Sequence, residues 1–346
     1  MSITTKSRRR VAASLACIAL LTAAATASAQ GTDSPTLKSV RERGELVCGV
    51  IGSSFGFSLP DSQGVMQGMD ADSCRAVAAA VLGDAAKVRF VPLIPAQRLT
   101  ALQAGEIDVL FAQLTWTLSR EANSGVQMTG VNYFDGTGFL VPTSLGVKSS
   151  RELDGANVCS IQGPGEVTAR DYFGSNNMSF TPVLFSEGEE LRKAFLAGRC
   201  DVYMIDQSAL ISFKTSLGPR GNDFVVLPEV ISHEPLSGAV RKGDGRWFDI
   251  VRYSLIAQVN AEELGVSSSN VDGFGSDARP AVKRLLGIDG KLGEALGLDK
   301  SWAKNIVKQV GNYGEMWSRS FGKTGADRGK NRLSANGGLQ YPYPMR

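Results

Sequence analysis

A glutamine, a threonine and an arginine follow a short apolar run in the first half of the chain. The run is Asp108-Val109-Leu110-Phe111, and Gln113, Thr115 and Arg120 come after it. Such a run predicts a buried strand, and open α/β sheets bind ligands at the carboxyl ends of their strands. A guanidinium can hold a carboxylate through two parallel charge-assisted hydrogen bonds, and a hydroxyl can complete the oxygen shell. The cluster therefore predicts a carboxylate-binding site, and the alternative is a surface arginine after an ordinary strand.

The elements that must position this cluster form two similar series along the chain. The first has expected strands at 46–50, 88–93 and 107–111, with helices at 69–82 and 97–104. The second has expected strands at 157–161, 180–185 and 201–205, with helices at 163–173 and 189–197. Residues 102–109 and 195–202 resemble each other, and each copy ends a helix with glycine and begins a strand. Alternation of strand and helix predicts two α/β units with mainly parallel sheets.

Further helices are expected at 247–264, 281–286 and 301–310. The strand order alone does not indicate which unit they cover. The tail at 322–346 is predicted to pack as mostly extended chain on the surface.

The chain opens with a three-part leader. Lys6 and the arginines at 8–10 precede an apolar run at 11–25, and Ala27-Ser28-Ala29 follows. This order is typical of a secretory signal peptide cleaved after Ala29. The run is shorter than the roughly 20 apolar residues of a membrane-spanning helix. We therefore expect residues 1–29 to be removed and the mature chain to be exported to the periplasm.

The mature chain would be nearly neutral. Removing the leader removes four of the 37 basic residues and none of the 34 acidic ones. This balance gives no electrostatic reason to expect a nucleic-acid or membrane-surface partner. The single histidine, His233, lies in a turn-like stretch, and no cysteine or histidine spacing indicates a metal. We expect no cofactor, no metal and no histidine-dependent catalysis.

Four cysteines remain after the leader, and an even number in an exported protein predicts disulfides. Pairing within each unit gives Cys48 with Cys74 and Cys159 with Cys200. Four cysteines allow three pairings, so this choice depends on the assignment of the two units. Four buried thiols are the alternative.

Several separate motifs occur along the chain in one order. They are Gly44–Val50, Gly68–Asp72, Ala104–Val109, Trp116–Arg120 and Asn312–Glu315. Together they resemble the periplasmic amino-acid-binding proteins of bacterial ABC importers, solute-binding protein family 3, and most closely the general L-amino-acid-binding type. The resemblance covers nearly the whole mature chain.

The resemblance implies the type II periplasmic binding protein fold. In this fold two α/β lobes are joined by two crossing strands and close on a ligand between them. Residues 36–138 with 241–346 would form lobe 1, and residues 139–240 would form lobe 2.

The resemblance also implies roles for individual residues. Thr115 and Arg120 match the clamp on the α-carboxylate of the ligand, and Gln113 lines the same strand end. Asp206 matches the aspartate that binds the α-ammonium, although a residue in its position often caps a helix. Phe55 or Phe57 falls where an aromatic ring covers the ligand side chain, and both could instead be core residues.

The chain departs from the family pattern at two places. Where the family usually has Gly-Thr-Thr, this chain has Gly163-Pro164-Gly165-Glu166, so the hydroxyls are lost. Free backbone amides at Gly163 and Gly165 could still face an anion at the start of a helix. Phe111, Ala112 and Leu114 stand where close relatives are more polar, with an arginine near position 112. These changes leave the class of ligand open.

We therefore expect a monomeric periplasmic binding protein and not an enzyme. It would capture an L-amino acid or related small carboxylate and deliver it to the membrane permease of an ABC importer. One alternative is an enzyme on the same scaffold, similar to cyclohexadienyl dehydratase, with Glu166 as its general acid. Another is the input protein of a sensor.

Overall fold

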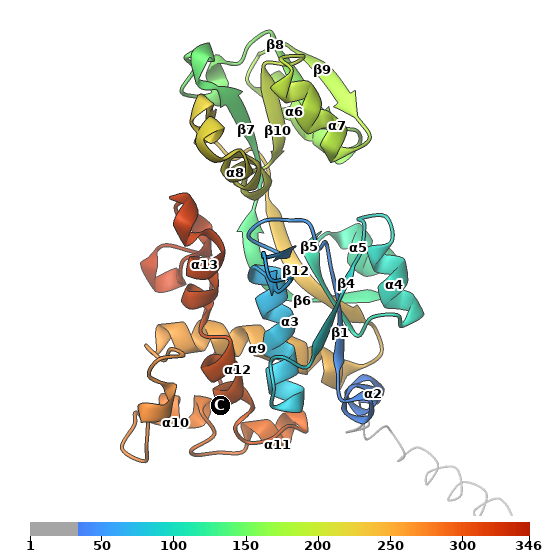
Figure 1. The fold of residues 1–346 in the computed structure, drawn as a ribbon. Coiled ribbons are helices and arrows are strands. Elements are labelled where there is room, and N and C mark those ends of the chain that lie inside the picture. Colours follow the sequence, from blue (N-terminus) through green and yellow to red (C-terminus); the bar gives the residue numbers. More distant parts are fainter. Residues whose placement is uncertain (1–33) are drawn as a thin grey trace, which may run out of the picture.

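The computed structural model describes residues 34–346, so the predicted signal peptide, residues 1–29, lies outside the described residues. The described chain forms two lobes joined by a narrow waist (Figure 1). Between residues 34 and 346, no helix has both the length and the apolar character needed to cross a membrane.

Lobe 1 is built on a mixed sheet with the strand order β4-β1-β5-β12-β6. Its strands are β1 (Leu46–Val50), β4 (Val88–Pro92), β5 (Val109–Thr115), β6 (Val126–Asp135) and β12 (Glu234–Arg241). β1 runs parallel to β4 and β5, whereas β12 runs antiparallel to β5 and β6. The parallel part of the sheet therefore directs the carboxyl end of β5, with Thr115, toward the waist.

The helices of lobe 1 come from both ends of the chain. They are α2 (Pro35–Arg43), α3 (Met69–Leu82), α4 (Arg98–Ala104), α5 (Leu118–Asn123), α9 (Gly245–Glu263), α10 (Pro280–Leu285), α11 (Leu292–Leu296), α12 (Trp302–Gln309) and α13 (Tyr313–Phe321). A small hairpin of β2 (Leu59–Pro60) and β3 (Met66–Gln67) precedes α3. The alanine-rich α3 packs against α9 and α12, and its small side chains allow this close approach. The helices after residue 245 thus complete the core of lobe 1.

Lobe 2 has a second mixed sheet with the order β11-β7-β10-β8-β9. Its strands are β7 (Thr137–Pro142), β8 (Ala156–Ile161), β9 (Phe180–Phe185), β10 (Val202–Asp206) and β11 (Phe224–Val226), and its helices are α6 (Pro164–Ser175), α7 (Gly188–Leu196) and α8 (Gln207–Ser216). Met204 packs with α6 on one face of the sheet, while Tyr203 packs with α7 and α8 on the other. The side chains of successive residues of β10 therefore point to opposite faces of the sheet.

The strand pairing differs from the expected lobe boundaries. β6 ends at Asp135 in the first sheet and β7 begins at Thr137 in the second, so the first crossing is at Gly136. β12, which the sequence placed in lobe 2, lies between β5 and β6 in lobe 1. Lobe 2 therefore begins at Thr137 and ends before Glu234. A strand carries no local sign of which sheet it joins, and that is why residues 234–240 were assigned to lobe 2.

The tail contributes more than surface packing. The side-chain oxygen of Asn331 accepts a hydrogen bond from the amide of Phe134 at 2.7 Å, and its nitrogen donates to the carbonyl of Phe134 at 3.0 Å. Gln340 donates to the carbonyl of Val131 at 3.2 Å. Two buried side chains of the tail therefore pair with β6 just before the first crossing, in place of the extended surface packing that was expected.

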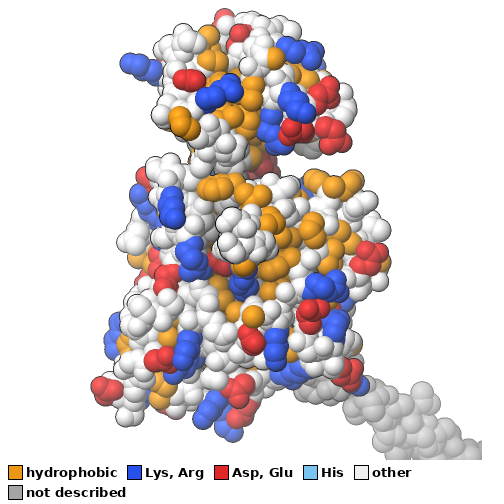
Figure 2. Space-filling view, in the orientation of Figure 1, with side chains coloured by type: hydrophobic (Ala, Val, Ile, Leu, Met, Phe, Trp, Pro, Cys, Tyr) orange, Lys and Arg blue, Asp and Glu red, His pale blue; other side chains and the backbone are white. Residues whose placement is uncertain are grey.

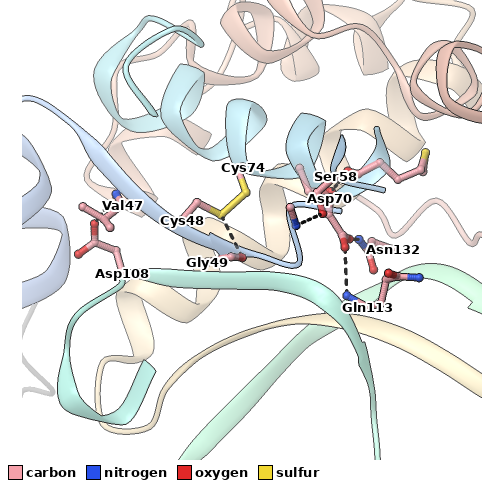
Figure 3. The surroundings of a disulfide bond; sticks show 12 residues. Val47, Cys48, Gly49, Ser58, Asp70, Cys74, Asp108, Gln113 and Asn132 are labelled. Atoms are coloured by element: carbon pink, nitrogen blue, oxygen red, sulfur yellow. Dashed lines mark hydrogen bonds between the residues drawn. A yellow bond between two sulfur atoms is a disulfide. The ribbon is translucent and has the colours of Figure 1, made fainter. Parts of the chain in front are cut away.

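Both predicted disulfides form. Cys48 is bonded to Cys74 and so ties β1 to α3, while Cys159 is bonded to Cys200 and ties β8 to the segment before β10 (Figure 3 shows the first). The pairing within each lobe is therefore confirmed.

Removing either disulfide should lower the free energy of unfolding. The bonded residues are 26 and 41 positions apart, and the chain-entropy relation gives about 3 to 4 kcal/mol for loops of this size. Thermal melts of the double variant Cys159→Ala/Cys200→Ala measure this loss for lobe 2. Peptide mapping without reduction is the direct check, and free thiols at all four positions would contradict the prediction.

Candidate ligand-binding site

The structure brings Thr115 and Arg120 together at the end of β5. Thr117 caps α5, because its hydroxyl accepts a hydrogen bond from the amide of Arg120. The helix then turns the Arg120 side chain back, and its Nη1 donates to the carbonyl of Thr115 at 2.7 Å. Partial burial lowers the pKa of Arg120, but a guanidinium stays charged in proteins. A cation is therefore held at the carboxyl end of this strand.

A second guanidinium, which the sequence reasoning missed, lies beside the first. Arg98, at the start of α4, is only 8% exposed, and its Nη1 donates to the carbonyls of Ala112 at 2.5 Å and Gln113 at 3.4 Å. Burial and the neighbouring charge of Arg120 lower its pKa to about 10, so it is still charged at neutral pH. Ala112 stands on β5 where the family pattern has an arginine, and here the guanidinium at this position comes from Arg98 of helix α4. Its absence at Ala112 was the signal that could have prompted a search for it.

The backbone between these two arginines is held in an uncommon conformation. Gln113 has φ 48°, in the left-handed region that costs a non-glycine residue about 1–2 kcal/mol. Its amide donates to Oδ2 of Asp70 at 3.0 Å, and Asn132 donates to Oδ1 at 3.0 Å (Figure 3). Asp70 is 1% exposed, and burial raises its pKa to about 6. This carboxylate therefore supports the bend at Gln113.

Asp206 ends β10 and stands at the N-cap of α8, yet within the described chain its side chain makes no capping hydrogen bond. The capping acid is Asp135, at the end of β6. Its Oδ1 accepts from the amides of Gly136 at 2.9 Å and Ser208 at 3.3 Å, and its Oδ2 accepts from the Ser208 hydroxyl. β6, the strand that leads into the first crossing, therefore supplies the cap of α8. This arrangement leaves the carboxylate of Asp206 available to a ligand.

The surroundings of Asp206 favour binding of a cation. Burial, followed by the nearby carboxylates of Asp135 and Glu234, raises its pKa to about 8, while Arg98 and Arg120 act in the opposite direction. The two arginines of lobe 1 are thus within electrostatic reach of an aspartate of lobe 2. A cationic group placed beside Asp206 would relieve the repulsion among the three acids.

The two phenylalanines of the first loop have different environments. Phe57 is fully buried and packs on Tyr133 and Phe321, with ring centroids 5.1 and 5.4 Å away. Phe55 is partly exposed and lines a cavity between the lobes. Its carbonyl accepts a hydrogen bond from the hydroxyl of Ser212 on α8 at 3.0 Å. Phe57 is therefore a core residue in this structure, and Phe55 is the ring that faces the space between the lobes.

Gly163 and Gly165 lie at the start of α6. Gly163 has φ 101°, which favours glycine, and a Cβ added there would meet no atom of the described chain within 4 Å. An open helix start of this kind can accept an anion through its amides. Glu166, the acid proposed for the enzymatic alternative, is paired with Arg170 one turn along the helix at 2.7 Å.

Comparison with known proteins identifies the family. Residues 46–265 match the model of the bacterial extracellular solute-binding proteins, family 3. The glutamate/glutamine/aspartate/asparagine-binding protein of Rhodobacter capsulatus is 45% identical over 338 residues, which are 96% of this chain and 98% of that protein. The general L-amino acid-binding periplasmic protein of Rhizobium johnstonii is 44% identical over 324 residues, 92% of this chain and 95% of that protein.

A solved structure shows the same fold over most of the chain. It is an ABC transporter periplasmic binding protein from Brucella ovis with glutathione bound, which is 43% identical. The TM-score is 0.85, and the match covers 91% of this chain and all of that one. The chain therefore belongs to family 3 of the bacterial extracellular solute-binding proteins. The predicted family and two-lobed fold are confirmed.

Proposed function

We propose that this protein captures an L-amino acid or a related small carboxylate between its lobes and delivers it to an ABC importer. One observation carries the proposal: Arg98 and Arg120 of lobe 1 act electrostatically on Asp206 of lobe 2. An amino acid is a zwitterion, so it needs a counter-charge at each end. A ligand that bridges these groups gains from both lobes at once.

Each site residue has a distinct role in this proposal. Arg120 binds the α-carboxylate with Thr115 and Gln113 nearby, and Asp206 binds the α-ammonium. Phe55 covers the ligand side chain. The amides of Gly163 and Gly165 supply donors from lobe 2.

The two crossings between the lobes pass close to each other at Gly136. A Cβ at Gly136 would lie 2.3 Å from Cγ1 of Val230 and 2.5 Å from the carbonyl of Ser232. Glycine therefore allows the first crossing to pass directly beside the second. A ligand that contacts both lobes would shift the population toward a closed form about this waist.

The names of the relatives support the ligand class and the transport role. Two relatives are named for binding amino acids, and the Brucella ovis protein holds glutathione, a γ-glutamyl tripeptide. We extend the ligand class to such peptides, because they carry the same α-carboxylate and α-ammonium. The protein acts as a monomer in the periplasm after cleavage of residues 1–29, and its partner is the membrane permease of the importer.

A thermal-shift screen of amino acids and γ-glutamyl peptides tests the proposed function. A ligand at about 100 times its Kd should add roughly 2.7 kcal/mol to stability. Methyl esters and N-acetyl derivatives of each hit are the matched controls, since they remove one charge each. Both should bind much more weakly than the parent compound. Derivatives that shift the melt as much as their parent would show that the two charges are not recognised.

A further inference from the structure

A cavity of about 490 Å³ lies between α7 and α8 of lobe 2, under the loop at 53–59 of lobe 1. Volumes of this size are typical of small-molecule sites. Figure 2 shows a band of apolar side chains on this part of lobe 2, with charged side chains on the α7 side. The cavity is therefore an amphipathic groove that both lobes line.

The cavity adjoins the site described above at two residues. Ile205, which lines it, directly precedes Asp206 on β10, and Phe55 belongs to both. Ile205 and Asp206 point to opposite faces of the sheet because they are consecutive residues of one strand. A ligand whose ammonium is held at Asp206 would therefore have to pass over the end of β10, beside Phe55, to reach the cavity.

The charged wall of the cavity carries an arginine. Arg192 of α7 is 41% exposed, and its Nη2 lies 2.8 Å from Oε2 of Glu189. Lys193 also pairs with Glu189, at 3.4 Å. Ion pairs this exposed contribute little to stability. Arg192 can therefore turn to a ligand carboxylate while Glu189 keeps Lys193 as its partner.

The nearby hydroxyls suit the same kind of ligand. Tyr203, a buried residue of β10, lines the cavity, and the charge of Arg192 acts on its phenol. Ser53 and Ser54 line it from lobe 1. The groove thus offers an apolar surface, with a cation and hydroxyl groups in its wall. This lining suits an elongated ligand that is uncharged in the middle and has an anionic group at its end.

We propose that this cavity is a distal subsite that binds a second carboxylate, at the far end of an extended γ-linked peptide, with Arg192 as its counter-charge. The inference rests on the proposed function, since it assumes that the α-amino acid end of the ligand is held at Arg120 and Asp206. It assigns to this chain a preference for γ-glutamyl peptides over single amino acids.

Calorimetry with paired ligands and paired variants tests the distal subsite. S-methylglutathione is the probe, because a blocked thiol cannot exchange with the two disulfides, and its glycine ethyl ester lacks only the distal carboxylate. Glutamine supplies the α-amino acid end alone. The variant is Arg192→Gln, and the control is Arg151→Gln, an exposed arginine of lobe 2 outside the cavity.

Wild-type protein should bind the acid about tenfold or more tightly than its ester, as expected for a charge-assisted hydrogen bond. Arg192→Gln should abolish this difference and leave glutamine binding unchanged, while Arg151→Gln should change neither. The subsite is overturned if wild-type protein binds acid and ester equally well. It is also overturned if Arg192→Gln weakens glutamine binding as much as it weakens binding of the acid. Either result leaves the proposed function standing. If none of the three compounds nor any amino acid binds, the proposed function fails, and the subsite fails with it.

Discussion

Replacing Arg120 with alanine should weaken ligand binding by about 3 to 5 kcal/mol, which is a few hundredfold or more. In a closed cleft the ligand carboxylate would lose the guanidinium that binds it through two hydrogen bonds, and it would remain buried without a partner. The free protein should be little affected, because every residue of α5 keeps accessible surface and, among residues 34–346, the Arg120 side chain donates a hydrogen bond only to the Thr115 carbonyl. Calorimetry with a ligand from the screen, together with melts of the free protein, measures both effects.

Three further variants make the Arg120 result specific. Arg120→Lys should recover only part of the affinity, because an ammonium cannot copy the planar fork. Arg89→Ala removes an exposed arginine paired with Glu45, and it should change neither quantity. Arg98→Ala should lower the stability of the free protein, because this buried side chain bonds two carbonyls of β5. If Arg120→Ala destabilises the free protein and leaves affinity intact, Arg120 is structural and does not hold the ligand carboxylate.

The sequence could predict only those candidate site residues whose position follows from a strand end. Thr115 and Arg120 come directly after an apolar run, so the rule that ligands bind at carboxyl ends of strands finds them. Arg98, Asp70 and Asp135 lie at the same candidate site, but they come from the starts of helices and from the end of β6. No spacing links them to the cluster, because only the packing of α3 and α4 against β5, and the pairing of β6 with β12 next to β5, bring them together.

Local rules also left open two choices that the tertiary structure decides. An aspartate before a helix is a good cap, but at Asp206 the cap comes from Asp135 on the other side of the waist. Phe55 and Phe57 are two positions apart in one loop, and no local pattern indicates which ring is buried. Tyr133 and Phe321 enclose Phe57, and these contacts come from distant parts of the chain.

Ligand binding should strengthen with pH between about pH 6 and pH 8. The pKa of Asp206 is raised to about 8, mainly by burial and then by Asp135 and Glu234, so the free protein holds a proton there at neutral pH. The ligand ammonium needs the ionised carboxylate, and binding must therefore release that proton. Affinity should rise by up to about tenfold per pH unit and level off near pH 8. Calorimetry in buffers of different ionisation enthalpy counts the released protons.

The stability of the free protein should change in the opposite direction. The folded-state pKa of Asp206 lies above its unfolded value of about 3.9, so the folded protein binds the proton more tightly. Its contribution to stability therefore falls as the pH rises from about 4 to about 8. Saturating ligand should offset this fall in the upper part of the range, where binding is strongest.

The variant Asp206→Asn separates this group from its neighbours. An amide has no charge to offer the ammonium, so binding should be weak at pH 8 and nearly independent of pH. The gap between wild type and variant should narrow toward pH 6, where the wild-type carboxyl is itself protonated. Asp154→Asn is the matched control, because it changes an exposed aspartate of lobe 2 that bonds Ser179, and it should keep the wild-type profile. A slope that persists in Asp206→Asn would assign the proton to another acid, and a flat wild-type profile would show that Asp206 is already ionised and does not hold the ammonium in the way proposed.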